Sequence, residues 1–274
     1  FSLCSALMLT WWRGLSNRRR VRFWRGVSYV VFVVLVAAFL IAVDWSRVID
    51  TMFRPEIVAE QFPDILLIAA KNTIWYTILG FTGGLILGLV LALMRLSQSA
   101  PFRWASATYI DVVRGIPLLV WILLIGLGLP IALGVRVPTT YGAGALALSL
   151  VMAAYMAETI RAGIEAVDRG QLEAARSLGM SHSKALVWII LPQAFRLMIP
   201  PLTNEFILLL KDTSLVSAIG VTVTTKELTR WGRDGVINSA NATPLVVAGL
   251  VYLALTIPMT RIVARVEKKA AQSK

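Results

Sequence analysis

The chain has 274 residues, of which 57% are hydrophobic and 15% are charged, and its formal net charge is +12. Soluble globular domains carry about 25% charged residues, so this composition excludes an ordinary soluble domain and predicts an integral membrane protein. Basic residues gather in the cytoplasmic loops of membrane proteins, so the positive charge needs no nucleic-acid partner to explain it. The single cysteine, Cys4, and the single histidine, His182, exclude an internal disulfide and a Cys/His metal centre.

Residues 1–12 are apolar and end in Trp11 and Trp12. No basic residue precedes them, which argues against a secretory signal peptide and favours an interfacial anchor with both tryptophans at headgroup level. The sequence begins at Phe1 rather than at methionine, which leaves the natural N-terminus open.

Six long apolar runs predict six membrane-spanning helices, because each run approaches the roughly 20 residues that cross a bilayer. Their apolar residues are continuous rather than alternating, which favours an all-α membrane protein over a β-barrel. Glu205, Lys211 and Asp212 interrupt the fifth run, and Pro138 and Gly142 mark the turn between the third and the fourth. The runs cover residues 26–43, 72–94, 115–135, 137–157, 200–225 and 235–260.

The charges outside these runs predict the orientation of the chain. The N-terminal segment holds six arginines and no acid, and the tail beyond Arg261 is also basic. Since cytoplasmic segments collect basic residues, both termini are expected in the cytoplasm, as an even number of spans requires. The expected parts are a cytoplasmic basic segment 1–25, a first helix 26–43, an extracytoplasmic loop 44–64 rich in acids, a membrane core 65–265 and a cytoplasmic tail 266–274.

Residues 162–199 form the longest expected cytoplasmic loop, and they contain helix-forming patterns. Residues 171–178 are dense in good helix formers, and Gly179 is suited to end that helix. Ser181 is suited to cap a second helix that runs to Leu191, where Pro192 is expected to stop or kink it. The expected result is two short helices on the membrane surface. They either pack under their own bundle or form a docking knob for a cytoplasmic partner.

The stretch EAARSLGMSHSKALVWIILP resembles the cytoplasmic coupling-loop motif of permease subunits in binding-protein-dependent ABC importers. The stretches YIDVVRGIPLLVWILL, AYMAETIRAGIEAVDRGQLEAA and LLKDTSLVSAIGV look like the polar amino acid group of this family, the histidine, glutamine and glutamate permeases. The resemblance covers about residues 65–265, residues 1–60 match nothing specific, and Ile116 stands where the family commonly has threonine. The matching motif positions are Glu173, Ala174, Ala175, Gly179, Ile189, Leu191 and Pro192.

The resemblance implies the type I ABC importer permease fold, a five-helix core to which this chain adds its first span. In that family the loop helices sit in a cleft on an ATP-binding subunit and transmit its motion to the membrane helices. The implied partners are two ATP-binding subunits, a second permease that is identical or similar, and an extracytoplasmic amino acid-binding protein, at the bacterial cytoplasmic (inner) membrane. The sequence has no G-x-x-x-x-G-K-[ST] loop, so ATP and Mg are expected on the partner, and this chain is expected to bind no cofactor and to catalyse no reaction.

Ionisable residues within a membrane span are candidates for the translocation path. Lys211 and Asp212 lie about ten residues into the fifth run, roughly 15 Å deep, near the midplane of the bilayer. Together with Thr213 and Ser214 they are suited to line a polar path for a zwitterion. A structural ion pair with another helix, or a helix that breaks at this point, explains them equally well.

Five further sets of residues have expected positions in the spans. Glu158 and Arg161 are expected to form an i,i+3 ion pair, and that structural role is favoured over transport. Arg114 is expected in the headgroup region. Other candidates for the path are Asn72 and Thr73 at the outer start of the second span, and Asn204 and Glu205 near the cytoplasmic mouth. Glycines at close-packing spacing are expected to seat another helix, namely Gly80, Gly83, Gly84 and Gly88.

Two other classes of protein were weighed against the importer. An ion-gradient-driven secondary transporter or channel often has paired halves with broken helices, and this chain shows one interrupted span and no repeat. A membrane enzyme needs clustered catalytic groups, for which one histidine and one cysteine supply little. The resemblance favours a polar amino acid as substrate, with glutamate or glutamine first. The particular amino acid, the pairing of the permeases, the location of the substrate site and the role of the first helix stay open.

Overall fold

The computed structural model describes residues 17–134 and 141–272, and every regular element within these ranges is a helix. The expectation of an all-α protein is therefore confirmed for the described residues. The chain divides into two compact units, Phe1–Thr51 and Met52–Lys274. The predicted anchor at residues 1–12 and the predicted turn residue Pro138 lie outside the described residues.

The first unit contains one long helix, α2 (Asn17–Ala42), followed by α3 (Trp45–Met52). The helix begins earlier than the predicted span 26–43, and its apolar part, Val21–Ala42, is long enough to cross a membrane. Asp44 Oδ1 accepts hydrogen bonds from the N–H of Arg47 (3.1 Å) and from Ser46 Oγ (2.7 Å), and these bonds lower the pKa of the Asp44 carboxyl.

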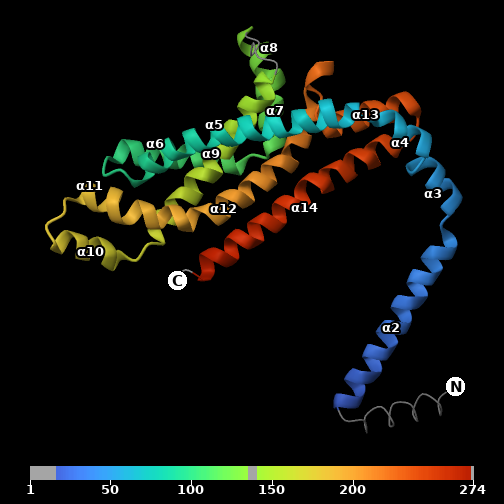
Figure 1. The fold of residues 1–274 in the computed structure, drawn as a ribbon, viewed down its shortest axis with the longest axis horizontal. Helices are drawn as coiled ribbons and strands as arrows, with labels where there is room; N and C mark the ends of the chain where they lie inside the picture. The colour runs from blue at the N-terminus through green and yellow to red at the C-terminus, as the bar shows by residue number, and fades with distance from the viewer. Residues whose placement is uncertain (1–16, 135–140, 273–274) are drawn as a thin grey trace, which may run out of the picture. The chain divides into compact units, whose positions relative to one another are not determined.

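The second unit is a bundle of long helices joined by short ones (Figure 1). The segment expected as an extracytoplasmic loop at 44–64 contains two short helices. In chain order the elements are α4 (Pro55–Gln61), η1 (Ile65–Ala70), α5 (Lys71–Leu96), α6 (Ala100–Gly115), α7 (Leu118–Leu123), η2 (Leu124–Gly128), α8 (Leu129–Leu133), α9 (Gly142–Glu165), α10 (Arg169–Ser177), α11 (His182–Ala185), η3 (Leu186–Ile190), α12 (Leu191–Asp212), η4 (Thr213–Ala218), η5 (Val223–Thr225), α13 (Leu228–Ser239) and α14 (Thr243–Gln272).

Helices α5 and α9 form the central pair of this bundle, side by side and parallel (Figure 1). A Cβ built on Gly80 would lie 2.9 Å from Leu148 Cβ, and one built on Gly88 would lie 2.8 Å from Met156 Cβ. Such distances leave no room for a side chain, so the backbones approach closely. The predicted packing role of the glycines is confirmed, since Gly83 and Gly84 likewise face Ser149 and Met152.

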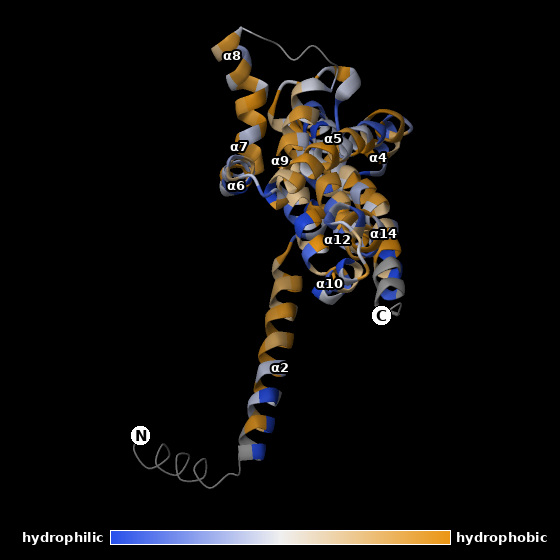
Figure 2. Ribbon diagram, turned by 90° about the vertical axis from the view of Figure 1, so that its left-hand side faces the viewer, coloured by the Kyte–Doolittle hydropathy of each residue, from blue (hydrophilic) through white to orange (hydrophobic). Residues whose placement is uncertain are grey.

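The apolar helices of the described chain give five to six candidate spans, in agreement with the predicted six. Large apolar side chains cover the outside of α5 and α14, whereas hydrophilic residues gather at α10 and at the C-terminal end of α14 (Figure 2). The five single candidates are Val21–Ala42, Ile65–Leu96, Gly142–Glu165, His182–Ala218 and Thr243–Arg265, and one bent pair supplies the sixth.

The third predicted span, residues 115–135, is wrong as a straight helix. The structure has two helical segments instead, Ala100–Gly115 and Leu118–Leu133, which meet at an angle of 101°. The break falls at Ile116 and Pro117, because proline fixes its own φ and disfavours the helical conformation in the residue before it. Helix α6 packs against α5.

The prediction that Pro192 stops or kinks the second loop helix is also wrong. Helices α11, η3 and α12 form one candidate span, His182–Ala218, rather than a surface helix followed by a separate span. The π-helical turn η3 ends where Leu191 N donates to Leu186 O, and Pro192 occupies the next turn, where α12 begins. A proline in the first turn of a helix needs no N–H donor, so the chain continues as a helix.

Candidate coupling loop and translocation path

Both ends of α10 are closed by local hydrogen bonds. Asp168 caps its N-terminus through the side chain, a cap that the sequence reading did not anticipate. At the C-terminus Gly179 has φ +85°, its N–H donates to Arg176 O (3.0 Å), and the N–H of Met180 donates to Ala175 O (3.2 Å). This pair of bonds is the Schellman motif, which favours glycine at the left-handed position. The predicted helix end at Gly179 is confirmed.

The two faces of α10 have different surroundings. Ala175 is buried at 5% exposure, and Leu172 packs against the cluster of apolar residues that includes Ile190. The opposite face carries Glu173, which is exposed, and Leu178 at the end of the helix is 85% exposed. One face of α10 therefore packs on its own bundle, and the other face is exposed.

The start of α11 faces α10 across an open hollow. Ser181 Oγ accepts a hydrogen bond from Lys184 N (3.4 Å), so the predicted cap is confirmed. The hollow has a volume of about 520 Å³ and is lined by residues that include Leu172, His182 and Leu186. Helix α10 is thus seated on the bundle mainly through one face, with space beside it.

Lys211 and Asp212 form the last turn of α12, which then tightens into the 3₁₀ turn η4. The helix does not break at these residues, since His182–Ala218 is one helical span, and neither residue forms an ion pair with another described residue. Lys211 is exposed and Asp212 is partly buried, so the two side chains have different surroundings as expected. The side chain of Leu209 lies against Gly80, which is at the middle of the span Ile65–Leu96.

Charged residues of α6, α9 and α12 interact in pairs along the bundle. Asp212 and Arg114 are the charged groups that act on Glu205, and Arg114 also acts on Glu158. The guanidinium of Arg114 sits 5.2 Å from the ring centroid of Tyr155, which is a cation–π distance. From the sequence, Arg114 was expected among lipid headgroups. Its interactions with charged groups on other helices could not be predicted, because no sequence spacing relates residues of α6, α9 and α12. Asn204 is exposed beside Glu205, Thr213 is buried and Ser214 is partly buried.

Two other candidate sets serve the structure. Arg161 binds Glu158 (2.7 Å) as predicted and also binds Glu165 (2.6 Å) one turn later. Asn72 is buried, donates to Thr224 O and Lys226 O, and accepts from Tyr141. Thr73 is likewise buried, donating to Ala69 O and accepting from Leu228 N. Asn72 and Thr73 hold α5 to the segment before α13 rather than facing an open path.

A buried carboxylate, Glu227, caps α13 at the end of the bundle away from α10. It accepts hydrogen bonds from the N–H groups of Thr229 and Arg230 (both 2.6 Å) and from Tyr252 Oη (3.0 Å). Burial raises the pKa of Glu227 to about 7, although these hydrogen bonds act to lower the pKa. Sequence reasoning missed this group, because Glu227 and its partner Tyr252 are on separate helices.

Replacing Glu227 by glutamine is expected to flatten the pH dependence of stability. Because the folded pKa of about 7 lies above the ordinary 4.5, the folded chain keeps a proton between these values that the unfolded chain releases. Wild-type stability should therefore fall as pH rises from about 4.5 to about 7, by on the order of 3 kcal/mol. The check is the melting temperature of wild type and Glu227→Gln at pH 5 and pH 8. A glutamine variant whose melting temperature falls as steeply as that of the wild type would contradict this.

Comparison with known proteins identifies the class of the chain. Residues 84–272 match the family of binding-protein-dependent transport system inner membrane components, and the chain belongs to that family. It is therefore a multi-pass component of the bacterial inner membrane, and the resemblance noted in the coupling loop is confirmed at the level of the family.

Its relatives include permeases of amino acid transport systems. The chain is 40% identical over 186 residues to the arginine transport system permease protein ArtQ of Bacillus subtilis, covering 68% of this chain and 83% of the relative. It is 34% identical over 235 residues to the glutamate/aspartate import permease protein GltK of Escherichia coli, covering 83% and 98%. A crystal structure of an amino acid ABC transporter with histidines superposes with a TM-score of 0.71 and 37% identity, covering 77% of this chain and 96% of that chain.

Proposed function

We propose that the chain is the permease subunit of an ATP-driven importer for polar amino acids and that α10 docks on an ATP-binding subunit in the cytoplasm. The observation that carries this is α10 itself, with one face anchored to the bundle and its motif residue Glu173 exposed beside Leu178. ATP and Mg belong on the partner, and this chain holds no cofactor. Relatives named for arginine, glutamine, cystine and glutamate/aspartate support a polar amino acid as substrate, with glutamate or glutamine first.

The proposed orientation places α10 and both chain ends in the cytoplasm. Helix α5 ends at Leu96 beside the hollow at α10, and α9 leads directly into α10, so both run toward the same side. Helix α13 and the start of α14 then lie on the outer side. The basic N-terminal segment and an even number of spans agree with this arrangement. The complex we propose has two ATP-binding subunits, a second permease and an extracytoplasmic amino acid-binding protein.

The translocation path we propose follows the charges between α6, α9 and α12. Glu205 lies within electrostatic range of both Asp212 and Arg114, so charges of both signs surround it, which suits the ammonium and carboxylate of a zwitterion. Lys211 is exposed on the same turn as Asp212 at mid-bundle depth. Charged groups at that depth are costly in lipid, so a polar route beside them accounts for their presence.

The proposed function is tested by purifying the chain in mild detergent after expression with its neighbouring genes. We expect a stoichiometric ATP-binding subunit by mass spectrometry, and an ATPase activity that rises when the binding protein and its amino acid are added. Screening amino acids in this assay names the substrate. A chain that purifies alone and moves substrate on an ion gradient without ATP would instead be a secondary transporter.

Neutralising the polar turn is expected to slow transport. Lys211→Met and Asp212→Asn should each lower the rate of amino acid uptake into proteoliposomes by about tenfold, since each removes on the order of 1–2 kcal/mol of favourable interaction with a passing charge. Lys71→Met, at an exposed lysine at the start of α5, is the matched control and should transport normally. Wild-type rates in both variants of the turn would remove Lys211 and Asp212 from the path.

A further inference from the structure

The start of α2 is strongly basic, and nothing in its own unit neutralises it. Figure 2 shows hydrophilic residues at this end of the helix and hydrophobic residues along the rest. The only acids of the unit, Asp44 and Asp50, follow the other end of α2, and Ala42 at that end is about 25 Å along the helix axis from Arg25. The first nine residues of α2 contain five arginines, namely Arg18, Arg19, Arg20, Arg22 and Arg25.

Three of these arginines share one side of the helix. Arg18, Arg22 and Arg25 are spaced i, i+4 and i+7, which aligns their positions on one face, and we call these three residues the arginine face. A hollow of about 340 Å³ lies on this face, and its described lining consists of the arginine face and Val21. The orientation of a membrane protein depends on the number of basic residues in a segment and does not require them to share a face. The alignment therefore indicates a ligand for these side chains.

The arginine face lies at the depth of the lipid headgroups. The uncharged part of α2, residues 26–42, is about 25 Å long, close to the ~30 Å thickness of the hydrocarbon core. Trp24 lies beside Arg25, and its ring contacts the ring of Phe23 edge to face, with centroids 6.2 Å apart. Tryptophan is enriched at the membrane–water interface, so Trp24 marks that level on the helix. The guanidinium groups of Arg22 and Arg25 are then within reach of lipid phosphates.

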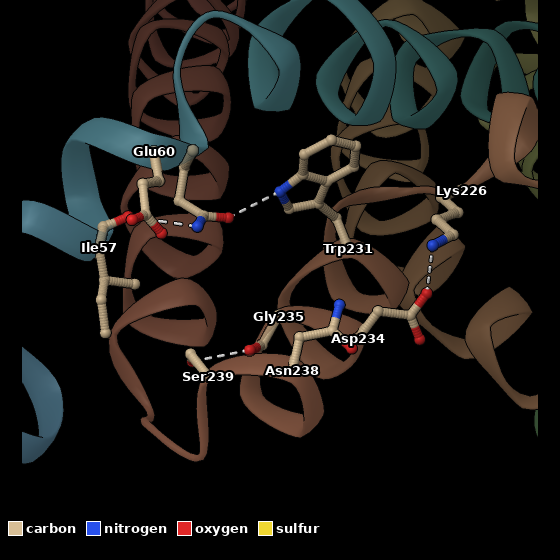
Figure 3. Close-up of a pocket in the computed structure, with 9 residues that line it drawn as sticks. Ile57, Glu60, Lys226, Trp231, Asp234, Gly235, Asn238 and Ser239 are labelled. Carbon is tan, nitrogen blue, oxygen red and sulfur yellow. Dashed lines mark hydrogen bonds and ion pairs between the residues drawn. The ribbon is translucent and has the colours of Figure 1, made fainter.

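The hollow between α4 and α13 shows a different arrangement of charge (Figure 3). Lys226 pairs with Asp234, and the same carboxylate also pairs with Arg230 at 3.0 Å. Glu60 lines this hollow as well, so two cations and two carboxylates balance there. A hollow without net charge selects neither an anion nor a cation. The arginine face, which has positive charge alone, selects an anion.

We propose that the arginine face binds the phosphate of an anionic phospholipid in the cytoplasmic leaflet. A guanidinium group donates two parallel hydrogen bonds to phosphate oxygens, and basic residues beside a membrane span attract anionic headgroups. A zwitterionic lipid carries the same phosphate, but its own ammonium group cancels the charge, so a headgroup with net negative charge fits better. The inference goes beyond the proposed function, since it requires only that α2 spans the membrane with its basic end in the cytoplasm.

The test measures the dissociation constant of phosphatidylglycerol from the purified full chain in detergent by native mass spectrometry. Each arginine near an anionic lipid contributes about fivefold in affinity, so Arg22→Gln combined with Arg25→Gln should weaken binding by roughly 25-fold. Arg22→Lys combined with Arg25→Lys keeps both charges, and with them the orientation, and should bind with intermediate affinity because lysine lacks the planar guanidinium group.

The matched control is Arg47→Gln combined with Arg54→Gln. It removes the same charge at two arginines that follow α2 in the chain, and it should bind phosphatidylglycerol like wild type. A loss of affinity equal to that of the double glutamine variant in α2 would show that the attraction depends on the net charge of the chain, and the site would not exist.

Three further results would overturn the inference. The first is wild-type affinity for phosphatidylglycerol in the double glutamine variant of α2. The second is equal affinity of the wild-type chain for phosphatidylglycerol and for phosphatidylcholine with the same acyl chains. The third is displacement of the lipid by inorganic phosphate, which would make the arginine face a site for free anions. Each leaves the proposed function standing, because association with an ATP-binding subunit and stimulated ATPase activity are measured separately.

Discussion

A chain carrying Gly179→Arg is expected to reach the membrane and lose at least about tenfold of its substrate-stimulated ATPase activity, equivalent to ~1.4 kcal/mol of docking energy. Gly179 has φ +85° and open space around its Cα, so an added side chain projects from the end of α10 into the surface that we propose for the ATP-binding subunit. Glu173→Lys should act in the same direction by reversing an exposed charge on that surface. The measurement is the ATPase rate of the purified complex with and without loaded binding protein.

Two control variants separate docking from folding. Gly179→Ala carries the same left-handed strain, about 1–2 kcal/mol, without the bulk, and should retain most of the stimulation. Gly134→Arg places the same large side chain at another left-handed glycine with open space, outside the loop, and should behave like wild type. Normal coupling in both Gly179→Arg and Glu173→Lys would show that α10 is not the contact.

Gly84→Val is expected to disrupt the fold of the bundle. A Cβ at Gly84 would lie 2.6 Å from Met152 Cβ and 3.3 Å from Met152 backbone carbon, so no flexible side-chain end is available to move aside. Helices α5 and α9 would have to separate, and overpacking of this kind costs about 1–3 kcal/mol. We expect a melting temperature lower by roughly 5–10 °C, together with a reduced yield of monodisperse complex.

The matched control for this variant is Gly249→Val in α14, where a Cβ meets nothing within 4 Å. Both substitutions place valine inside a long helix, so their difference measures the contact between α5 and α9 alone. Equal melting temperatures for the two variants would mean that the central pair tolerates separation, and the glycines would lose their packing role.

Much of this molecule was predictable from local pattern. Apolar runs located the long helices, glycine spacing located the close-packing face of α5, and Gly179 and Ser181 marked the helix end and start in the loop. These features depend on a few neighbouring residues and on backbone sterics. The motif around Glu173 pointed to the family because its residues have fixed spacing along one segment.

The errors have a different physical origin. The 101° bend near Pro117 and the continuous helix through Pro192 both occur at a proline. The sequence shows where a proline lies, but it does not show whether the turn before it can rearrange so that the helix continues. At Pro192 a π-helical turn allowed the helix to continue. The charge array around Arg114 and the buried Glu227 needed side chains from helices far apart in sequence, which only the tertiary packing brings together.

The continuity of α11, η3 and α12 has a mechanical consequence. Pro200 and Pro201 lie inside α12, near the middle of the span His182–Ala218, and the helix continues through both of them. The helix then acts as a lever with arms of about 27 Å toward His182 and about 17 Å toward Asp212. A rotation of about 10° at that fulcrum would carry Asp212 by roughly 3 Å when the loop end moves by roughly 5 Å. A displacement of the loop end would therefore move the charged turn at the other end by a smaller, proportional distance.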